Sequence, residues 1–225
     1  MTNLLVIITA VLAFNGLLMA YLNWAFAAER FKPHRFRAEP VVMRVDASDR
    51  RANARRNMLI SVGMFYAAVV LLYPWLFVDG PVSWRTIAWQ SVLVLSVYDL
   101  GYYFMHRYAH TQKWLMKIHA VHHKARYPSA RDSLWIHPYE TAAGVGLLLL
   151  TILALGPVHI HAFAIMFLVY TASNILIHSG IAFPRYPLKL FNGLAEQHYG
   201  HHMVNMNRNF ATITRFWDRL FGTSL

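Results

Sequence analysis

The sequence contains no cysteine and few acidic residues. The absence of cysteine excludes both a disulfide scaffold and a metal site built from thiolates. Only 10 Asp and Glu residues stand against 21 Lys and Arg residues, so the formal net charge is +11. Charged residues make up 14% of the 225 positions, whereas hydrophobic residues make up 57%. A chain this apolar is not typical of a soluble domain and favours a bundle of membrane helices.

Long uncharged stretches indicate where the membrane helices lie. Residues 3–27 carry no charge and are long enough to cross a bilayer. No basic segment precedes this stretch and no small-residue cleavage site follows it, so we expect a retained anchor, not a signal peptide. We expect further spans at 58–78 and 86–105, the second of them following a short turn at Asp79–Trp84. Residues 1–84 would then form anchor spans and a basic loop, and residues 85–225 a second domain.

The runs 141–156 and 158–178 flank Gly156-Pro157 and predict a helical hairpin. The first run is short, so a re-entrant segment is the alternative to a full crossing. The predicted fold class is therefore all-α: an integral membrane helical bundle of about three full spans plus this hairpin, capped by a histidine-rich metal-binding region.

The basic residues are concentrated in three segments. Residues 28–57 hold nine of them, 105–140 hold six and 181–225 hold five, whereas the 79–85 turn holds only Arg85. The positive-inside rule places the three rich segments in the cytoplasm. Topology therefore accounts for the positive charge, and we expect no nucleic-acid partner. Contact between the 28–57 loop and anionic lipid is a second interpretation of the same charges.

Eight of the 13 histidines form a recurrent pattern, and a ninth candidate, His178, stands alone at the end of an apolar run. Two lie four residues apart, and two further sets follow the spacing i, i+3, i+4, so on a helix each set shares one face. Imidazole suits Zn, Cu, Fe and Ni, and nine nitrogens exceed what one ion takes. The sequence therefore predicts two metal ions. The candidate ligands are His106, His110, His119, His122, His123, His178, His198, His201 and His202.

The remaining histidines are expected to lie elsewhere. His159 and His161 fall at the tip of the predicted hairpin, and His34 falls in the basic loop. The topology deduced from the charges alone puts all nine candidate ligands on the cytoplasmic side, together.

Several polar residues are predicted to support the ligands. Asp99 lies inside a predicted span, seven residues before His106, and is expected to accept a hydrogen bond from a ligand imidazole. A bond between helices is the alternative for Asp99. Asn174 and Asn205 follow the same logic, since each lies within a turn of a candidate ligand.

The sequence H-P-Y-E begins the predicted hairpin. Pro138 suits the first turn of a helix. Glu140 is expected to bond a ligand histidine, with an ordinary helix-start acid as the alternative. His137 is a further candidate supporting residue.

The histidines form the motifs H-x3-H, H-x2-H-H and H-x2-H-H. Further sequences accompany them: D-x6-H-R-x2-H from Asp99, H-P-x-E at His137 and the final R-N-F…F-W-D-R-L-F-G-T. In these motifs the chain resembles the fatty acid hydroxylase/sterol desaturase superfamily. The resemblance covers about residues 85–225. It implies that the nine histidines are catalytic ligands of two iron ions, although zinc can take the same ligands in purified protein. Some relatives carry a further histidine where this chain has Ala182, so the resemblance leaves His137 or water as the substitute at that place.

The resemblance also implies an activity. Such enzymes use O2 to hydroxylate a fatty acyl, sterol or related lipid C–H bond, and close relatives desaturate the bond. No haem or flavin motif is visible, so a separate electron donor (a reductase, ferredoxin or cytochrome) is implied. The expected location is the bacterial inner membrane or the endoplasmic reticulum, with the active site on the cytoplasmic face.

Other classes remain as alternatives. A metal transporter or another non-redox membrane metal protein would place ligands near the membrane midplane, whereas these cluster at one face. A zinc hydrolase would carry a helical H-E-x-x-H, which is not found. An inactive scaffold would have lost ligands, and all eight family histidines are present.

Overall fold

The computed structural model describes residues 1–37, 46–125 and 128–225. Parts of the predicted basic loop, including Pro40 and Arg44, and the basic residue Arg126 lie outside these ranges. The described elements, in chain order, are α1 (Thr2–Ala27), η1 (Glu29–His34), α2 (Ala47–Leu76), β1 (Phe77–Val78), α3 (Trp84–Thr111), α4 (Lys113–His123), η2 (Ala130–Leu134), α5 (Pro138–Leu155), β2 (Val158–His159), α6 (Ile160–Ile177), η3 (Leu188–Phe191), α7 (Asn192–Met203) and α8 (Phe216–Leu220).

Four helices are long and apolar enough to cross a membrane: α1, α2, α5 and α6. The predicted all-α membrane fold is therefore confirmed, and both helices of the hairpin are candidate spans. The expected span at 86–105 lies in α3, which is not one of these four helices. α3 has 28 residues, but residues such as Gln90 and Asp99 lower its hydropathy.

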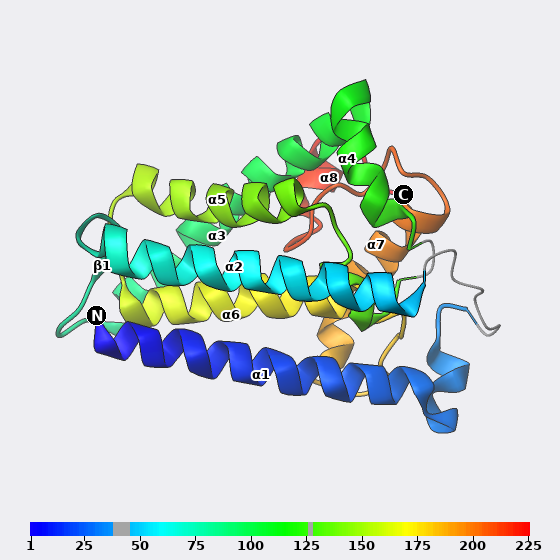
Figure 1. Ribbon diagram of the computed structural model, residues 1–225, viewed down its shortest axis with the longest axis horizontal. Coiled ribbons are helices and arrows are strands. Elements are labelled where there is room, and N and C mark those ends of the chain that lie inside the picture. The colour runs from blue at the N-terminus through cyan, green and yellow to red at the C-terminus, as the bar shows by residue number, and fades with distance from the viewer. Residues whose placement is uncertain (38–45, 126–127) are drawn as a thin grey trace.

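The helices lie side by side with their ends at two opposite poles. α1 packs against α6, α2 packs against α5, and α3 packs against both α5 and α6. The N-terminus and β1 lie at one pole, while α4, α7, α8 and the C-terminus lie at the other (Figure 1). At the first pole β1 pairs with β2 in parallel, with Phe77 opposite Val158. This short pairing ties the end of α2 to the start of α6.

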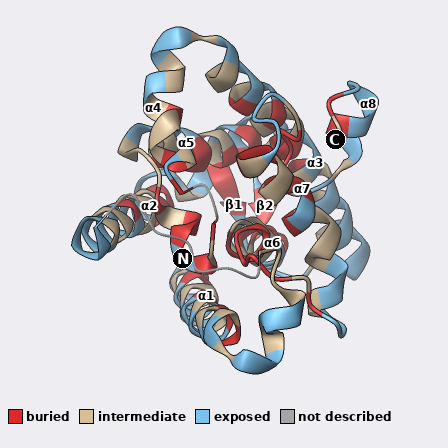
Figure 2. Cartoon of the chain, turned by 90° about the vertical axis from the view of Figure 1, so that its right-hand side faces the viewer, coloured by how far each residue is buried: buried red, intermediate tan, exposed pale blue. Residues whose placement is uncertain are grey.

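α6 occupies the middle of the bundle, as the end-on view shows (Figure 2). Phe163 and Phe167 on α6 are fully buried and pack against Phe65 of α2, with 4.5 Å between the ring centroids of Phe65 and Phe167. By contrast, only 11% of the apolar window of α1 is buried. Because exposed apolar helix faces are stable in hydrocarbon, this outer surface is the one that meets lipid.

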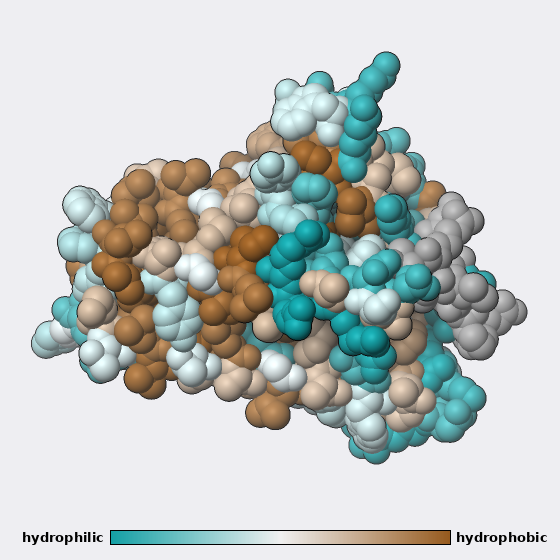
Figure 3. Space-filling model, in the orientation of Figure 1, coloured by the Kyte–Doolittle hydropathy of each residue, from teal (hydrophilic) through white to brown (hydrophobic). Residues whose placement is uncertain are grey.

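Surface polarity follows the same axis. In the space-filling view hydrophobic residues gather over the part of the bundle near β1, and hydrophilic residues gather near α4 and the C-terminus (Figure 3). Ser83 caps the start of α3, because its side chain accepts a hydrogen bond from Thr86 N, and the helix continues well past residue 105 to Thr111. α4 then turns back, so this helical pair forms one wall of a polar cap.

Candidate metal centre

The nine predicted ligands come together in the cap. His106 and His110 lie in the last two turns of α3, and His178 directly follows the end of α6. The other six come from α4 and α7. Seven of the nine are buried, and His110 and His123 are partly buried. His159 and His161 lie at the opposite pole, where His159 Nε2 is 2.9 Å from the Gly80 carbonyl oxygen, so their exclusion agrees with the structure.

The histidines divide into two groups. Within each group, one nitrogen of every residue lies within 4.8 Å of the others. The five-histidine group is His106, His110, His119, His123 and His201, and the four-histidine group is His122, His178, His198 and His202. Two groups of four and five nitrogens match the coordination numbers expected of two separate ions.

The sequence predicted one ligand direction per motif, and on this point the structure differs. Residues i and i+4, such as His119 and His123 or His198 and His202, stay in the same group. The residue at i+3 goes to the other group: His122 leaves its motif partners, and so does His201. Neighbouring positions on a helix are rotated by about 100°, so His122 and His123 point to different centres. Each H-x-x-H-H motif therefore contributes to both groups.

Hydrogen bonds fix the orientation of five of the rings through Nδ1. A carbonyl oxygen only accepts a hydrogen bond, so the imidazole nitrogen facing it must carry the proton. The Nδ1 partners are the backbone oxygens of Phe210 for His106 (2.8 Å), Trp135 for His122 (3.2 Å), Asn174 for His178 (2.6 Å) and Arg208 for His201 (2.7 Å), and the Glu140 carboxylate for His119 (2.7 Å).

This arrangement tests whether a metal ion fits. His106 and His119 both commit their Nδ1 protons outward, yet their Nε2 atoms lie 3.1 Å apart. His122 and His178 do the same, with 3.3 Å between Nε2 atoms. In each pair two lone pairs face each other without a proton between them, which is unfavourable unless a cation lies there. The donor set therefore fits one cation in each group.

The electrostatics also favour metal binding. Burial, and after it the neighbouring imidazoles, hold the pKa of His198, His201 and His202 well below the ordinary value. The same two causes lower the pKa of His123. These rings are therefore neutral at physiological pH, and the neutral imidazole is the form that binds metals.

The predicted bond from Glu140 to a ligand histidine is present in the structure. Glu140 begins α5, where Pro138 occupies the first turn, and its Oε1 accepts from Nδ1 of His119 at 2.7 Å. Its second oxygen, Oε2, is buried without a partner among the described residues. A carboxylate on the outer nitrogen fixes the tautomer and raises the basicity of the ligand nitrogen.

Two other predicted supporting roles are wrong. Asp99 does not contact an imidazole; its carboxylate accepts from the backbone N–H groups of Thr212, Ile213 and Thr214, at 3.0 to 3.3 Å. It therefore holds the C-terminal segment against α3, which is closer to the helix–helix alternative. His137 caps α5, because its Nδ1 accepts from Tyr139 N at 3.3 Å, and it belongs to neither group.

Of the two asparagines predicted to support a ligand, Asn174 contacts a histidine and Asn205 does not. Asn174 supports His178 through its backbone oxygen, while its side chain donates to the Ser133 carbonyl oxygen at 3.1 Å. Asn205 lies in the turn after α7, where its side chain accepts from Asn207 N at 2.9 Å, and it does not reach a histidine. The predicted support from Asn205 is therefore wrong.

A cavity of about 800 Å³ connects the membrane bundle to the four-histidine group. Its wall includes Leu12 of α1, Phe65 of α2 and Phe167 of α6 in the bundle, and His122 and His178 at the centre. No ligand of the five-histidine group lines it. An elongated, mostly apolar space that ends at the polar groups of a site is the usual form of a ligand pocket.

Comparison with known proteins identifies the class. Residues 91–223 match the sequence profile of the fatty acid hydroxylase family, described as "Fatty acid hydroxylase". The match covers more than half of the chain, so the chain belongs to this family, as the histidine motifs predicted. The structure adds that it is an integral membrane member with two histidine clusters.

Particular relatives are monooxygenases and hydroxylases. The chain is similar to methylsterol monooxygenase 1 of Gallus gallus, with 32% identity over 165 residues, which is 72% of this chain and 54% of the relative. It is also similar to sphingolipid C4-hydroxylase sur2 of Schizosaccharomyces pombe, with 34% identity over 146 residues, 60% of this chain and 48% of the relative. The chain thus spans about half the length of these relatives. No solved structure matches.

The bond from Glu140 to His119 carries a testable consequence. We expect Glu140→Gln to lower metal affinity at the five-histidine group by roughly 10–100-fold, because a neutral amide accepts the Nδ1 proton less strongly. The measurement is metal content by mass spectrometry during dialysis against a weak chelator, and the two histidine groups predict about two ions per chain in the unchanged protein at the start. Glu196→Gln, on the exposed side of α7, is the matched control. Equal retention in both variants would contradict the role of Glu140.

Proposed function

We propose that this protein is an O2-dependent di-iron membrane enzyme that hydroxylates a C–H bond of a lipid. The observation that carries the proposal is the cavity that leads from the apolar bundle to His122, His178 and His198. A lipid chain fits an apolar space between membrane helices, and its reactive carbon would then meet the metal centre without leaving the membrane. The names of the relatives support oxidation of lipids.

The roles of the residues follow from their contacts. All nine histidines would present Nε2 to the two ions. When bound, two iron ions supply the redox chemistry that O2 requires. Glu140 keeps the proton of His119 on Nδ1, and the Trp135 and Asn174 backbone oxygens do the same for His122 and His178. These bonds hold the Nε2 lone pairs toward the ions. Phe65 and Phe167 exclude water around the chain of the substrate.

Desaturation is the second candidate reaction. It needs the same cavity and the same centre, and it differs only in whether a second hydrogen is removed instead of oxygen being added. A non-redox metal protein or transporter is less well supported. Transporters place their binding sites near the bilayer midplane, whereas both histidine groups lie at one pole of the bundle.

The proposal includes a location and a partner. The described basic residues of α4 and of the segment after α7, such as Lys113, Lys117 and Arg208, lie near the metal pole, whereas Arg85 lies near the other. By the positive-inside rule, the centre would face the cytoplasm, in a bacterial inner membrane or the endoplasmic reticulum. Electrons would come from a separate reductase, ferredoxin or cytochrome, and an acidic carrier would find a basic surface there. In this proposal residues 85–225 form the catalytic domain.

Lipid mass spectrometry under labelled oxygen gas tests the proposal. A host that expresses the protein under oxygen-18 gas should accumulate a lipid heavier by one labelled oxygen atom, and the vector control should not. Loss of two hydrogens from a lipid would instead identify the desaturase. His161→Ala, at the far pole, should behave as the unchanged protein. A lipid profile identical to that of the vector control, in a host supplied with iron and reductant, would contradict the proposed enzymatic activity.

A further inference from the structure

The wall that α2 contributes to the cavity changes from cationic to apolar along its length. Arg51, Arg55, Met58, Val62 and Phe65 all line the cavity. They are spaced three or four residues apart, so they form one stripe on one face of the helix. From Arg51 to Phe65 the stripe runs about 21 Å at the rise of an α-helix. Its order, a charged end followed by an apolar length, is that of a single-chain amphipathic lipid.

The charge at this end is not compensated by protein acids. Of the four arginines that line the cavity, Arg50 is paired with the buried Asp132. No acidic partner is found for Arg51, Arg55 or Arg131 among the residues that the structure describes. Among the described residues of the lining, Glu140 is the only acid, and its Oε1 already accepts a bond from His119. At this end of the cavity, the exposed side chains of Arg51, Arg55 and Arg131 are therefore open to an anion from outside the described protein.

We propose that the substrate carries an anionic head group, a carboxylate or a phosphate, that binds Arg51, Arg55 and Arg131. This rests on the proposed lipid oxidation and names the class of lipid. A guanidinium group binds two oxygens of a carboxylate or of a phosphate through a pair of parallel hydrogen bonds. The chain of the lipid then follows Met58, Val62 and Phe65. A neutral hydroxyl would leave the arginines uncompensated, and an amine would be repelled.

The position of the metal centre along this stripe identifies the carbon that reacts. Asn57 Nδ2 donates to the carbonyl oxygens of Leu134 (3.1 Å) and Ile136 (2.8 Å), and the Trp135 oxygen between them accepts from His122 Nδ1. The four-histidine group thus lies level with Asn57. That is about 3 Å beyond Arg55 along the helix, and about 12 Å before Phe65. Oxidation therefore falls on the first few carbons after the head group.

A head-group series tests this without turnover. Oleic acid, oleyl phosphate, oleyl alcohol and oleylamine share one chain and differ only in charge. Each would displace fluorescent cis-parinaric acid from the purified, metal-loaded protein in a neutral detergent, in mildly alkaline buffer. We expect the two anionic lipids to displace the probe at concentrations about tenfold lower than the alcohol, with the amine weakest. Comparison of the two anions decides between carboxylate and phosphate.

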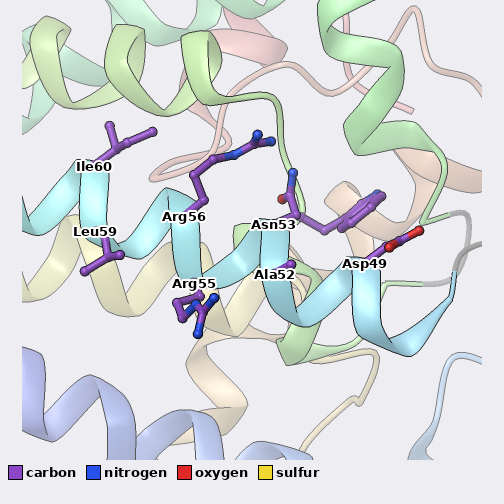
Figure 4. Close-up of a pocket in the computed structure, with 8 residues that line it drawn as sticks. Asp49, Ala52, Asn53, Arg55, Arg56, Leu59 and Ile60 are labelled. Atoms are coloured by element: carbon purple, nitrogen blue, oxygen red, sulfur yellow. The ribbon is translucent and has the colours of Figure 1, made fainter.

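A matched set of variants separates this site from general attraction to a basic surface. Arg51→Gln and Arg131→Gln should each reduce the preference for the anion over the alcohol severalfold. The control is Arg56→Gln. Arg55 and Arg56 leave α2 on opposite sides (Figure 4); Arg55 lines both the cavity and an outer groove, whereas Arg56 lines only the groove. Arg56→Gln should keep the preference, and Arg51→Glu should shift it toward the amine.

The outcomes distinguish the two proposals. Equal displacement by all four lipids, or an equal effect of Arg51→Gln and Arg56→Gln, would overturn the anionic head group and leave lipid oxidation standing. Failure of every lipid to displace the probe would overturn both. In the oxidised lipid, fragmentation should locate the new oxygen near the head group, and an oxygen at the far end of the chain would overturn the placement of the reactive carbon.

Discussion

His122→Ala is expected to abolish lipid oxidation while the fold and part of the metal remain. His122 faces the cavity and belongs to the four-histidine group, which it shares with only three other residues. Loss of a supporting partner alone typically costs 10–100-fold in affinity or activity, so loss of a ligand should exceed roughly a hundredfold. The five-histidine group keeps all its members. We therefore expect product formation to vanish and metal content to fall from about two ions to about one.

The control for this variant is His137→Ala. His137 is also a histidine at the start of a cap-facing helix, but it caps α5 and lies outside both groups. Its replacement should reduce stability slightly and leave metal content unchanged. If His122→Ala kept both its ions and its product, or if His137→Ala lost an ion, the division of ligands into two groups would be wrong.

Asp218→Ala is expected to cause a large loss of stability. Asp218 is fully buried, and its carboxylate accepts from Phe210 N, Ala211 N, Gln197 Nε2 and Thr223 Oγ1, at 2.7 to 2.9 Å. Removal leaves these donors buried and unsatisfied, at a cost of about 1–3 kcal/mol each. After relaxation we expect a loss of about 3–5 kcal/mol, comparable to removal of one partner from a buried pair. Thermal unfolding in detergent measures it.

This variant should also affect the metal centre. The Phe210 whose N–H bonds Asp218 is the residue whose carbonyl oxygen receives the Nδ1 proton of His106. Asp49→Ala, which removes an exposed acid from α2, is the control and should leave the melting temperature nearly unchanged. A melting temperature for Asp218→Ala equal to that of the control would mean that the C-terminal segment contributes little to the cap.

Spacing along a helix made the ligands predictable, because the i, i+4 pairs point the same way in any α-helix. The spacing of the histidines did not predict which centre each ring joins. His201 and His202 are neighbours that end in different groups, and this depends on how α7 is rotated against α3, α4 and α6. Such rotation is a matter of packing, which residues distant in sequence decide.

The partners of the imidazoles were harder to predict than the imidazoles. The oxygens that hold His106, His122 and His201 belong to the backbone, and a carbonyl has no residue type to recognise. The role of Asp99 was missed for a related reason: its partners are N–H groups more than a hundred positions away. The bond from His119 to Glu140 was predictable, because Glu140 is an acidic side chain in the first turn of a helix.

The cavity is lined by histidines of the four-histidine group and by none of the five-histidine group. The two groups therefore differ in access, although all their ligands are histidines. A solute that arrives from the bilayer meets His122, His178 and His198 first. No ligand of the five-histidine group lines the cavity, and Glu140 anchors His119 of that group. If the two groups hold the two proposed ions, nitric oxide that enters by this route should first change the spectrum of the ion in the four-histidine group.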